Sequence, residues 1–164
     1  LLEGAQDLFP EDPKVLAQLS NAYVDANKMD VALATFQKGI KSDPTNEVYR
    51  YNYGVLLLGA NDFESAAAQF QKAIDLKENY VSAYYNLGVT FLKWGAALQE
   101  QAIANDSDDM TYKEKFRMAV APLKRYLDDN PEDAKIWNFL GKIYANLGET
   151  DKSQEAFDKA DLYR

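Results

Sequence analysis

Clustered carboxylates are the side chains of this sequence that could do chemistry by themselves. Asp106-Ser107-Asp108-Asp109 places three of them within four residues, a density that can hold a cation. The cluster lacks the glycine and the terminal glutamate of a calcium loop, so we expect a solvated hairpin tip whose carboxylates cap a helix. Asp128-Asp129 and Glu132-Asp133 flank Pro131, and paired carboxylates can hydrolyse glycosides. That reaction needs a closed cleft that shifts one pKa, whereas these residues fall in an exposed turn, where their charge favours the dipole of the next helix.

The residue types that are missing exclude most other chemistry. The chain has no cysteine and no histidine, which removes thiol nucleophiles, disulfides, Cys/His metal sites and histidine acid–base catalysis together. We therefore expect no enzyme activity, no cofactor and no metal site. The absence of cysteine is compatible with the cytosol or with a periplasmic or secreted compartment. A chain that starts at Leu1 could also have lost a signal segment.

Charge and hydrophobicity narrow the class of partner. The net charge of the 164 residues is −8, and 47% of them are hydrophobic. Nucleic acid and anionic membranes are poor partners for such a chain on electrostatic grounds. The clearest apolar run is Val55-Leu56-Leu57-Leu58, far shorter than the roughly 18 residues that span a bilayer. We expect neither nucleic-acid binding nor membrane insertion.

One motif recurs along the chain and organises it. Trp137, Leu140, Gly141 and Tyr144 follow the spacing W-x2-L-G-x2-Y. Three earlier segments repeat this spacing with substitutions: Leu16, Leu19, Ser20 and Tyr23; Arg50, Tyr53, Gly54 and Leu57; and Tyr84, Leu87, Gly88 and Phe91. A second motif follows each of them: Ala32-x3-Phe36, Ala66-x3-Phe70, Ala119-x3-Leu123 and Ser153-x3-Phe157. Pro10 and Pro44 lie 34 residues apart, which is the length of one period.

This layout resembles the tetratricopeptide repeat, a helix–turn–helix unit of about 34 residues. The resemblance implies an all-α fold, a right-handed superhelical array (α-solenoid) of antiparallel helix pairs that are stable only when stacked. It makes the chain a single repeat domain, residues 1–164, in five segments: the tail of a preceding repeat at 1–12, repeat one at 13–46, repeat two at 47–80, an extended repeat three at 81–133 and repeat four at 134–164. Turns are expected at 27–30, with Asp30 as the cap, at 59–62 and at 147–150.

Repeat three is 19 residues longer than the family pattern. Residues 96–104 continue as good helix formers beyond Gly95, and the break comes at 105–109. Thr111-x-x-Glu114 then matches a capping box that opens the next helix. We expect each helix to gain about nine residues. The longer hairpin could be a second contact surface, could fold over one end of the binding groove, or could have no role of its own.

Small residues are predicted where the two helices of a repeat cross. Gly54, Gly88, Gly141 and Ser20 occupy this position, where a large side chain would push the helices apart. The expected small partners on the second helices are Ala32, Ala66, Ala119 and Ser153. Aromatic residues are expected between neighbouring repeats: Tyr23, Phe36, Phe70, Phe91, Tyr144 and Phe157.

In this family the first helices line the concave side, and the resemblance places a binding surface there. Its middle is apolar and aromatic, around Tyr51, Val55, Tyr85 and Val89, and lysines mark its rims. Such a strip is not needed for packing inside a repeat, so it should meet a partner or a neighbouring segment of the same protein. The predicted peptide-binding residues are Asn21, Tyr51, Asn52, Val55, Tyr85, Asn86, Val89, Lys93, Asn138 and Lys142.

Asparagines of the first helices have a separate expected role. Asn52 and Asn86 share the sixth position of successive repeats, where family members often hold the backbone of an extended peptide. One subset of the family grips the C-terminal carboxylate of heat-shock chaperones with lysine, asparagine and arginine. Asn21 and Asn52 match two asparagines of that clamp, but Ala17, Ser82 and Asn86 stand where its basic anchors belong. We therefore do not expect that ligand.

The sequence thus predicts a non-catalytic scaffold that binds a peptide or protein segment. Three alternatives stay open. The array could stack end to end between copies, because its last helix, ending at 162–164, has no polar capping helix after it. It could be a regulatory segment of a larger protein. Finally, Tyr51 and Tyr85 could simply cover the helix surface, with both asparagines solvated.

Overall fold

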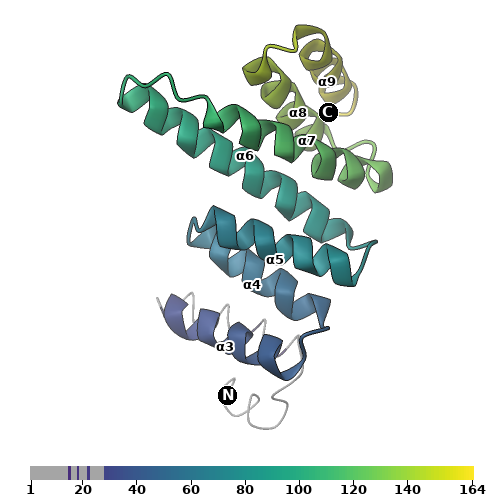
Figure 1. Ribbon diagram of the computed structural model, residues 1–164. Helices are drawn as coiled ribbons and strands as arrows, with labels where there is room; N and C mark the ends of the chain where they lie inside the picture. The colour runs from purple at the N-terminus through teal and green to yellow at the C-terminus, as the bar shows by residue number, and fades with distance from the viewer. Residues whose placement is uncertain (1–14, 16–17, 19–21, 23–27) are drawn as a thin grey trace. The chain divides into compact units, whose positions relative to one another are not determined.

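The computed structural model describes residues 15, 18, 22 and 28–164 (Figure 1). From residue 28 on, they form helices joined by short turns: α3 (Met29–Ser42), α4 (Glu47–Gly59), α5 (Phe63–Leu76), α6 (Val81–Ala104), α7 (Thr111–Asp129), α8 (Ala134–Leu147) and α9 (Thr150–Leu162). The described residues contain no strand, and the prediction of an all-α fold is confirmed. The predicted tail 1–12, Asn21 and most of the first helix of repeat one lie outside the described residues.

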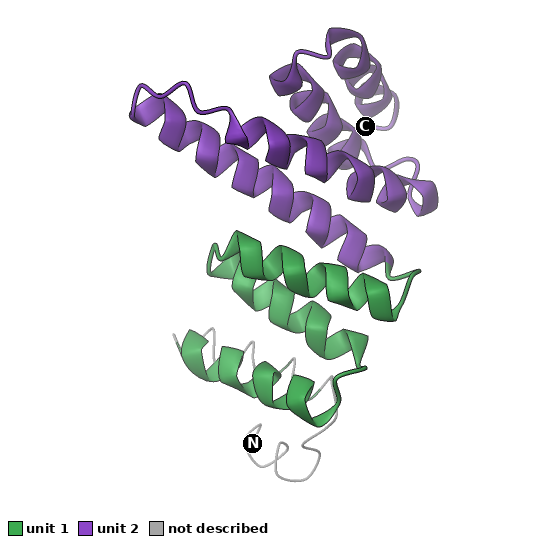
Figure 2. Cartoon of the chain, viewed as in Figure 1, with its two compact units in different colours: residues 1–80 green, residues 81–164 purple. Residues whose placement is uncertain are grey.

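The chain divides into two compact units, residues 1–80 and 81–164 (Figure 2). The division coincides with the predicted boundary between repeats two and three. Within unit 1, α4 packs against α5, and α3 packs against α4. Within unit 2, α6 packs against α7, α8 packs against α9, and α7 joins the two pairs by packing against α8. No helix of the described residues combines the length and the apolar character that a membrane span requires.

Helix boundaries follow from capping residues. The side chains of Asn46, Asp62 and Asp133 each accept a hydrogen bond from a backbone N–H in the first turn of α4, α5 and α8, at 3.0, 3.2 and 3.2 Å. Gly148 ends α8 with a φ of 79°, a left-handed conformation that glycine adopts without strain. The predicted cap Asp30 is wrong: α3 begins at Met29, and the acidic side chain instead lies in the first turn of the helix.

Repeat three contains the longest helices of the described residues. α6 has 24 residues and α7 has 19, against 13 or 14 in the other helices. The added residues are therefore shared unequally, and not about nine each. The predicted capping box is also wrong, because Thr111 is already the first residue of α7. Its N–H donates to Asp109 Oδ1 at 2.8 Å, so the aspartate of the turn takes the role expected of the threonine.

The conserved spacing of glycines reflects close crossing of paired helices. A Cβ added to Gly54 would lie 2.9 Å from the ring of Phe70, and one added to Gly141 would lie 2.6 Å from the ring of Phe157. Both distances are shorter than side-chain contacts allow, which confirms the predicted crossing. The two phenylalanines therefore pack inside their own repeat, and the expectation that they fill the space between neighbouring repeats is wrong. Ser153 Oγ also donates to the carbonyl of Gly141 at 2.9 Å, across the same crossing.

The α6–α7 pair has two such crossings. A Cβ on Gly88 would lie 2.5 Å from the side chain of Leu123, which is fully buried. A Cβ on Gly95, seven residues later, would lie 2.7 Å from the ring of Phe116, seven residues before Leu123. The extended repeat thus places a leucine where the other repeats have phenylalanine, and adds a second glycine–phenylalanine contact further along the same helices.

Candidate protein-interaction surfaces

The predicted surface in unit 1 centres on Tyr51 of α4. Its ring is half-buried and packs against the rings of Tyr80 and Phe70, with centroids 4.9 and 5.9 Å away. Val55, one turn later, remains 40% exposed. Burial raises the pKa of the Tyr80 hydroxyl to about 12, and the neighbouring Tyr51 and Glu47 raise it further. Tyr51 is therefore held in place by other rings while part of its surface stays open.

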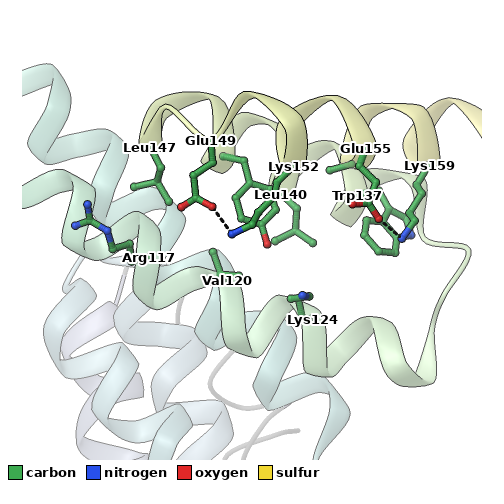
Figure 3. A pocket seen from close by; sticks show the side chains of 12 residues that line it. Arg117, Val120, Lys124, Trp137, Leu140, Leu147, Glu149, Lys152, Glu155 and Lys159 are labelled. Atoms are coloured by element: carbon green, nitrogen blue, oxygen red, sulfur yellow. Dashed lines mark hydrogen bonds and ion pairs between the residues drawn. The ribbon is translucent and has the colours of Figure 1, made fainter.

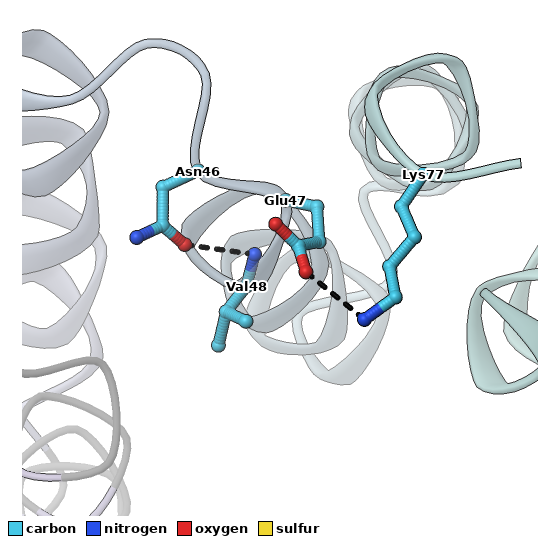
Figure 4. A network of polar contacts seen from close by, with 4 residues as sticks. All are labelled: Asn46, Glu47, Val48 and Lys77. Atoms are coloured by element: carbon cyan, nitrogen blue, oxygen red, sulfur yellow. Dashed lines mark hydrogen bonds and ion pairs between the residues drawn. The ribbon is translucent and has the colours of Figure 1, made fainter. Parts of the chain in front are cut away.

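An ion pair closes the same end of the α4–α5 pair. Glu47, in the first turn of α4, accepts a hydrogen bond from Lys77 Nζ at 3.1 Å, next to the cap formed by Asn46 (Figure 4). Lys77 Nζ also lies 5.2 Å from the centroid of the Tyr80 ring. These contacts join the residue after α5 to the start of α4, and so fix the aromatic cluster beside Tyr51.

The two asparagines predicted to hold a peptide are half-buried. Asn52 Nδ2 donates to the carbonyl of Val48 at 2.9 Å, one turn earlier in α4. This bond uses one of its two N–H groups and leaves the other N–H and the carbonyl oxygen. The backbone carbonyl of Asn86 accepts a hydrogen bond from Thr90 Oγ1 at 2.6 Å. The amide of Asn52 is thus oriented by its own helix.

In unit 2 the predicted surface lies along α6 and α8. The ring of Tyr85 packs against Tyr126 of α7 at 5.2 Å, and its hydroxyl accepts a hydrogen bond from Lys135 Nζ at 3.1 Å. That bond raises the pKa of Lys135. Further along, Gln99 Nε2 donates to Asn146 Oδ1 at 2.7 Å. The first helices of repeats three and four are therefore connected at two points along one face.

The remaining predicted residues are not part of the core. Val89 and Asn138 are half-buried, whereas Lys93 and Lys142 are exposed. Sequence reasoning missed Gln99 and Tyr126. Gln99 lies 14 residues after Tyr85, close to four helical turns, so its place on the same face could have been found from helical spacing. The contribution of Tyr126 comes from a second helix, and no pattern on the first helices points to it.

A pocket of about 460 Å³ lies in unit 2 between α7 and α9, with α8 as its floor (Figure 3). Its α8 residues include Leu140 and Tyr144, whereas Lys135 and Asn146 of α8 bind α6. At about 100° per residue, these two pairs lie on roughly opposite sides of α8. The pocket is therefore separate from the predicted surface. It is lined by Arg117, Val120, Lys124, Trp137, Leu140, Tyr144, Leu147, Glu149, Lys152, Glu155, Ala156 and Lys159.

The acidic hairpin tip has structural uses for its side chains. Asp109 caps α7, and Ser107 Oγ accepts a hydrogen bond from the N–H of Asp109 at 3.2 Å. Asp106 takes a left-handed backbone conformation with a φ of 48°. In the described part of the chain, no group of three or more acidic side chains is arranged to hold a metal ion.

Comparison with known proteins identifies the family. A family model described as TPR repeat matches residues 56–95, and a model described as tetratricopeptide repeat matches residues 13–46 and 134–163. Over 92% of its length the chain is 26% identical to anaphase-promoting complex subunit 3 of Schizosaccharomyces pombe, and over 57% it is 27% identical to the peroxisomal targeting signal receptor of Saccharomyces cerevisiae. It spans 20% and 15% of the length of these relatives.

A solved structure shares the fold. The crystal structure of MamA superposes with a TM-score of 0.76 at 20% identity, covering 99% of this chain and 84% of that one. This likeness extends over the helix pairs of both units. The repeated motifs, the paired helices that cross at glycine and the matched family models together show that the chain belongs to the tetratricopeptide repeat family.

Proposed function

We propose that this chain is a non-catalytic scaffold that binds a peptide or protein segment on its first-helix face. This face is formed by α4 in unit 1 and by α6 and α8 in unit 2. One observation carries the proposal: none of the described residues predicted to bind is buried, although two of them are tyrosines and two are valines. The core of each unit is complete without them, so their apolar surface is available to a partner.

Tyr85 is the strongest candidate for an anchor. Its ring is held by Tyr126 and its hydroxyl by Lys135, so little side-chain freedom remains to be lost on binding. Tyrosine is also among the residues enriched where truncation costs most affinity. Tyr51 has the corresponding support from Tyr80 and Phe70 in unit 1.

Polar residues of the face would orient the bound segment. Asn52 keeps one N–H and its carbonyl oxygen after bonding to its own helix, enough to pair with the backbone of an extended peptide. Lys93 and Lys142 are exposed at the rims and would attract acidic groups of the segment. One relative is named as a subunit of a complex and another as a receptor for a targeting signal, which supports a role in recognising proteins.

The test is capture of partners by the chain and by the Tyr51→Ala/Tyr85→Ala variant, followed by mass spectrometry and measurement of Kd for the captured segment. Each truncated anchor should cost on the order of 2 kcal/mol, or about 30-fold in Kd. Met118→Ala is the matched control, because Met118 is 41% exposed but lies on the second helix α7. An unchanged Kd in a variant that melts like the original chain would remove the tyrosines from the site.

Self-association is a second candidate function, favoured by one observation. Leu162 at the end of α9 is 73% exposed, and the neighbouring Tyr163 is also exposed. An apolar pair of this kind could pack against another copy. Light scattering over a range of concentrations tests it: the mass should rise with concentration and should return to that of a monomer in Leu162→Asp.

A further inference from the structure

We infer that the pocket between α7 and α9 is a second docking site, which takes an amphipathic helix of a partner protein. The partner helix would carry two carboxylates seven residues apart, with apolar side chains between them. This inference goes beyond the first-helix face, since the pocket lies on the other side of α8. It depends on charges, apolar surface and spacing within unit 2.

The rim of the pocket on α7 is cationic. Arg117 and Lys124 are exposed, and neither takes part in an ion pair with any of the described residues. The opposite rim on α9 is neutral in sum, because its two lysines are paired with its two glutamates at 2.6 and 3.0 Å. The lining therefore has two uncompensated positive charges on a chain whose net charge is −8. Carboxylates are the groups that this rim would attract.

The floor of the pocket is apolar and aromatic. Leu140 is fully buried, whereas Trp137 and Val120 are half-buried and keep surface toward the pocket. Lys159 Nζ lies 4.3 Å from the centroid of the Trp137 ring, and Lys152 Nζ lies 5.6 Å from that of Tyr144. Two paired lysines thus cover the aromatic rings from the α9 side. A ligand with apolar side chains would meet the floor between this cover and α7.

The spacing of the free cations selects the shape of the ligand. Arg117 and Lys124 are seven residues apart on α7, which places them on one face at roughly 10.5 Å, with Val120 between them (Figure 3). A partner helix lying along α7 repeats this spacing with acidic residues at positions i and i+7, and its positions i+3 and i+4 then face the apolar floor. An extended strand rises about 3.3 Å per residue, so its positions about 10 Å apart point to opposite sides. A helix therefore fits the rim, and the pocket volume of about 460 Å³ receives its apolar side chains.

Two synthetic helical peptides of identical composition test the proposal. Both carry two leucines at positions i+3 and i+4 and a glutamate at position i, in an alanine-rich background. The second glutamate stands at i+7 in the probe and at i+9 in its control, where it faces the other side of the helix. Binding is followed by the fluorescence of Trp137 in a Trp94→Phe background, and by calorimetry. The probe should bind at least about tenfold more tightly than the control, and its affinity should fall with added salt.

Charge-reversal variants locate the binding. Arg117→Glu/Lys124→Glu should weaken the probe by at least about tenfold, because attraction at both ends becomes repulsion. The matched variant Lys38→Glu/Lys72→Glu changes the net charge equally at exposed positions of α3 and α5 and should bind as the original chain does. All four positions are exposed, so thermal melting should be unchanged. Equal binding of the two peptides, or equal loss in both variants, would overturn the proposal.

The same experiment separates a partner helix from a second copy of this chain. Sedimentation of the chain alone should show no association that depends on Arg117 and Lys124. If it does, and if the probe peptide binds no better than its control, the occupant is another copy and the inference is wrong. The capture experiment with the tyrosine variant reports on the first-helix face alone, so failure of one proposal leaves the other standing.

Discussion

Gly88→Ala adds one methyl group where α6 and α7 cross most closely, and its effect can be worked out from the contacts. The new Cβ would lie 2.5 Å from Cγ and Cδ2 of Leu123 and 3.2 Å from its backbone nitrogen. Leu123 is fully buried, so its side chain cannot move into solvent. The helices must separate or Leu123 must leave its rotamer, at a cost of about 2–3 kcal/mol. The higher helix propensity of alanine returns about 1 kcal/mol. The free energy of unfolding should therefore fall by about 1–2 kcal/mol.

Gly59→Ala is the matched control for this prediction. Gly59 is exposed at the end of α4, and an added Cβ would have no neighbour within 4 Å. The same methyl group should therefore leave the free energy of unfolding unchanged or raise it by up to about 1 kcal/mol. Urea unfolding followed by far-ultraviolet circular dichroism measures both variants against the original chain.

A double-mutant cycle with Leu123→Ala gives the decisive result. Shortening Leu123 removes the atoms that the new methyl group would strike, so Gly88→Ala in that background should be neutral or stabilising. If Gly88→Ala costs the same in both backgrounds, the contact with Leu123 does not limit the approach of α6 and α7, and the explanation given for the glycine motif fails.

Three further predictions concern other contacts. Burial raises the pKa of Tyr80 to about 12, so the folded chain keeps a proton that the unfolded chain loses near its ordinary pKa of 10.0; this stability is fully present below about pH 10 and is lost as the pH rises toward 12. Tyr80→Phe should flatten the corresponding part of an alkaline unfolding curve, and an identical curve would contradict the burial. Asp133 both caps α8 and accepts a hydrogen bond from the Tyr126 hydroxyl at 3.0 Å, so Asp133→Ala should cost about 1–2 kcal/mol in urea unfolding, more than Asp62→Ala, which removes a cap alone. Equal losses would show that the tyrosine bond adds nothing. Gly148→Ala forces a side chain into a φ of 79° and should lower the free energy of unfolding by about 1 kcal/mol; an unchanged urea midpoint would mean that the end of α8 rearranges freely.

The helix pairs could be predicted because their crossings demand small residues at a fixed interval. Gly54, Gly88 and Gly141 recur with that interval, and each meets a side chain of its paired helix. Helix ends were less predictable where two polar residues compete. Asp109 and Thr111 can both cap α7, and only the backbone path of the turn decides in favour of the aspartate. The choice depends on geometry that spacing along the chain does not contain.

Contacts made by second helices were the least predictable. Phe70 and Phe157 follow a motif whose spacing says that they are buried, but not whether they face their own repeat or the next one. The pocket between α7 and α9 was missed for a similar reason. Arg117 and Lys124 are ordinary surface residues in the sequence, and they line a common pocket only because α8 spaces α7 from α9. Surfaces assembled from several helices need the packing to be known.

The paired glycine crossings of α6 and α7 have a consequence for the order in which unit 2 forms. Gly88 against Leu123 and Gly95 against Phe116 fix the sliding position of these helices at two places instead of one. A hairpin fastened twice has one register only, and its contacts are local in the chain, so we expect it to assemble early and to serve as the template on which α8 and then α9 settle. The lengthened repeat would then be the seed from which this half of the array grows.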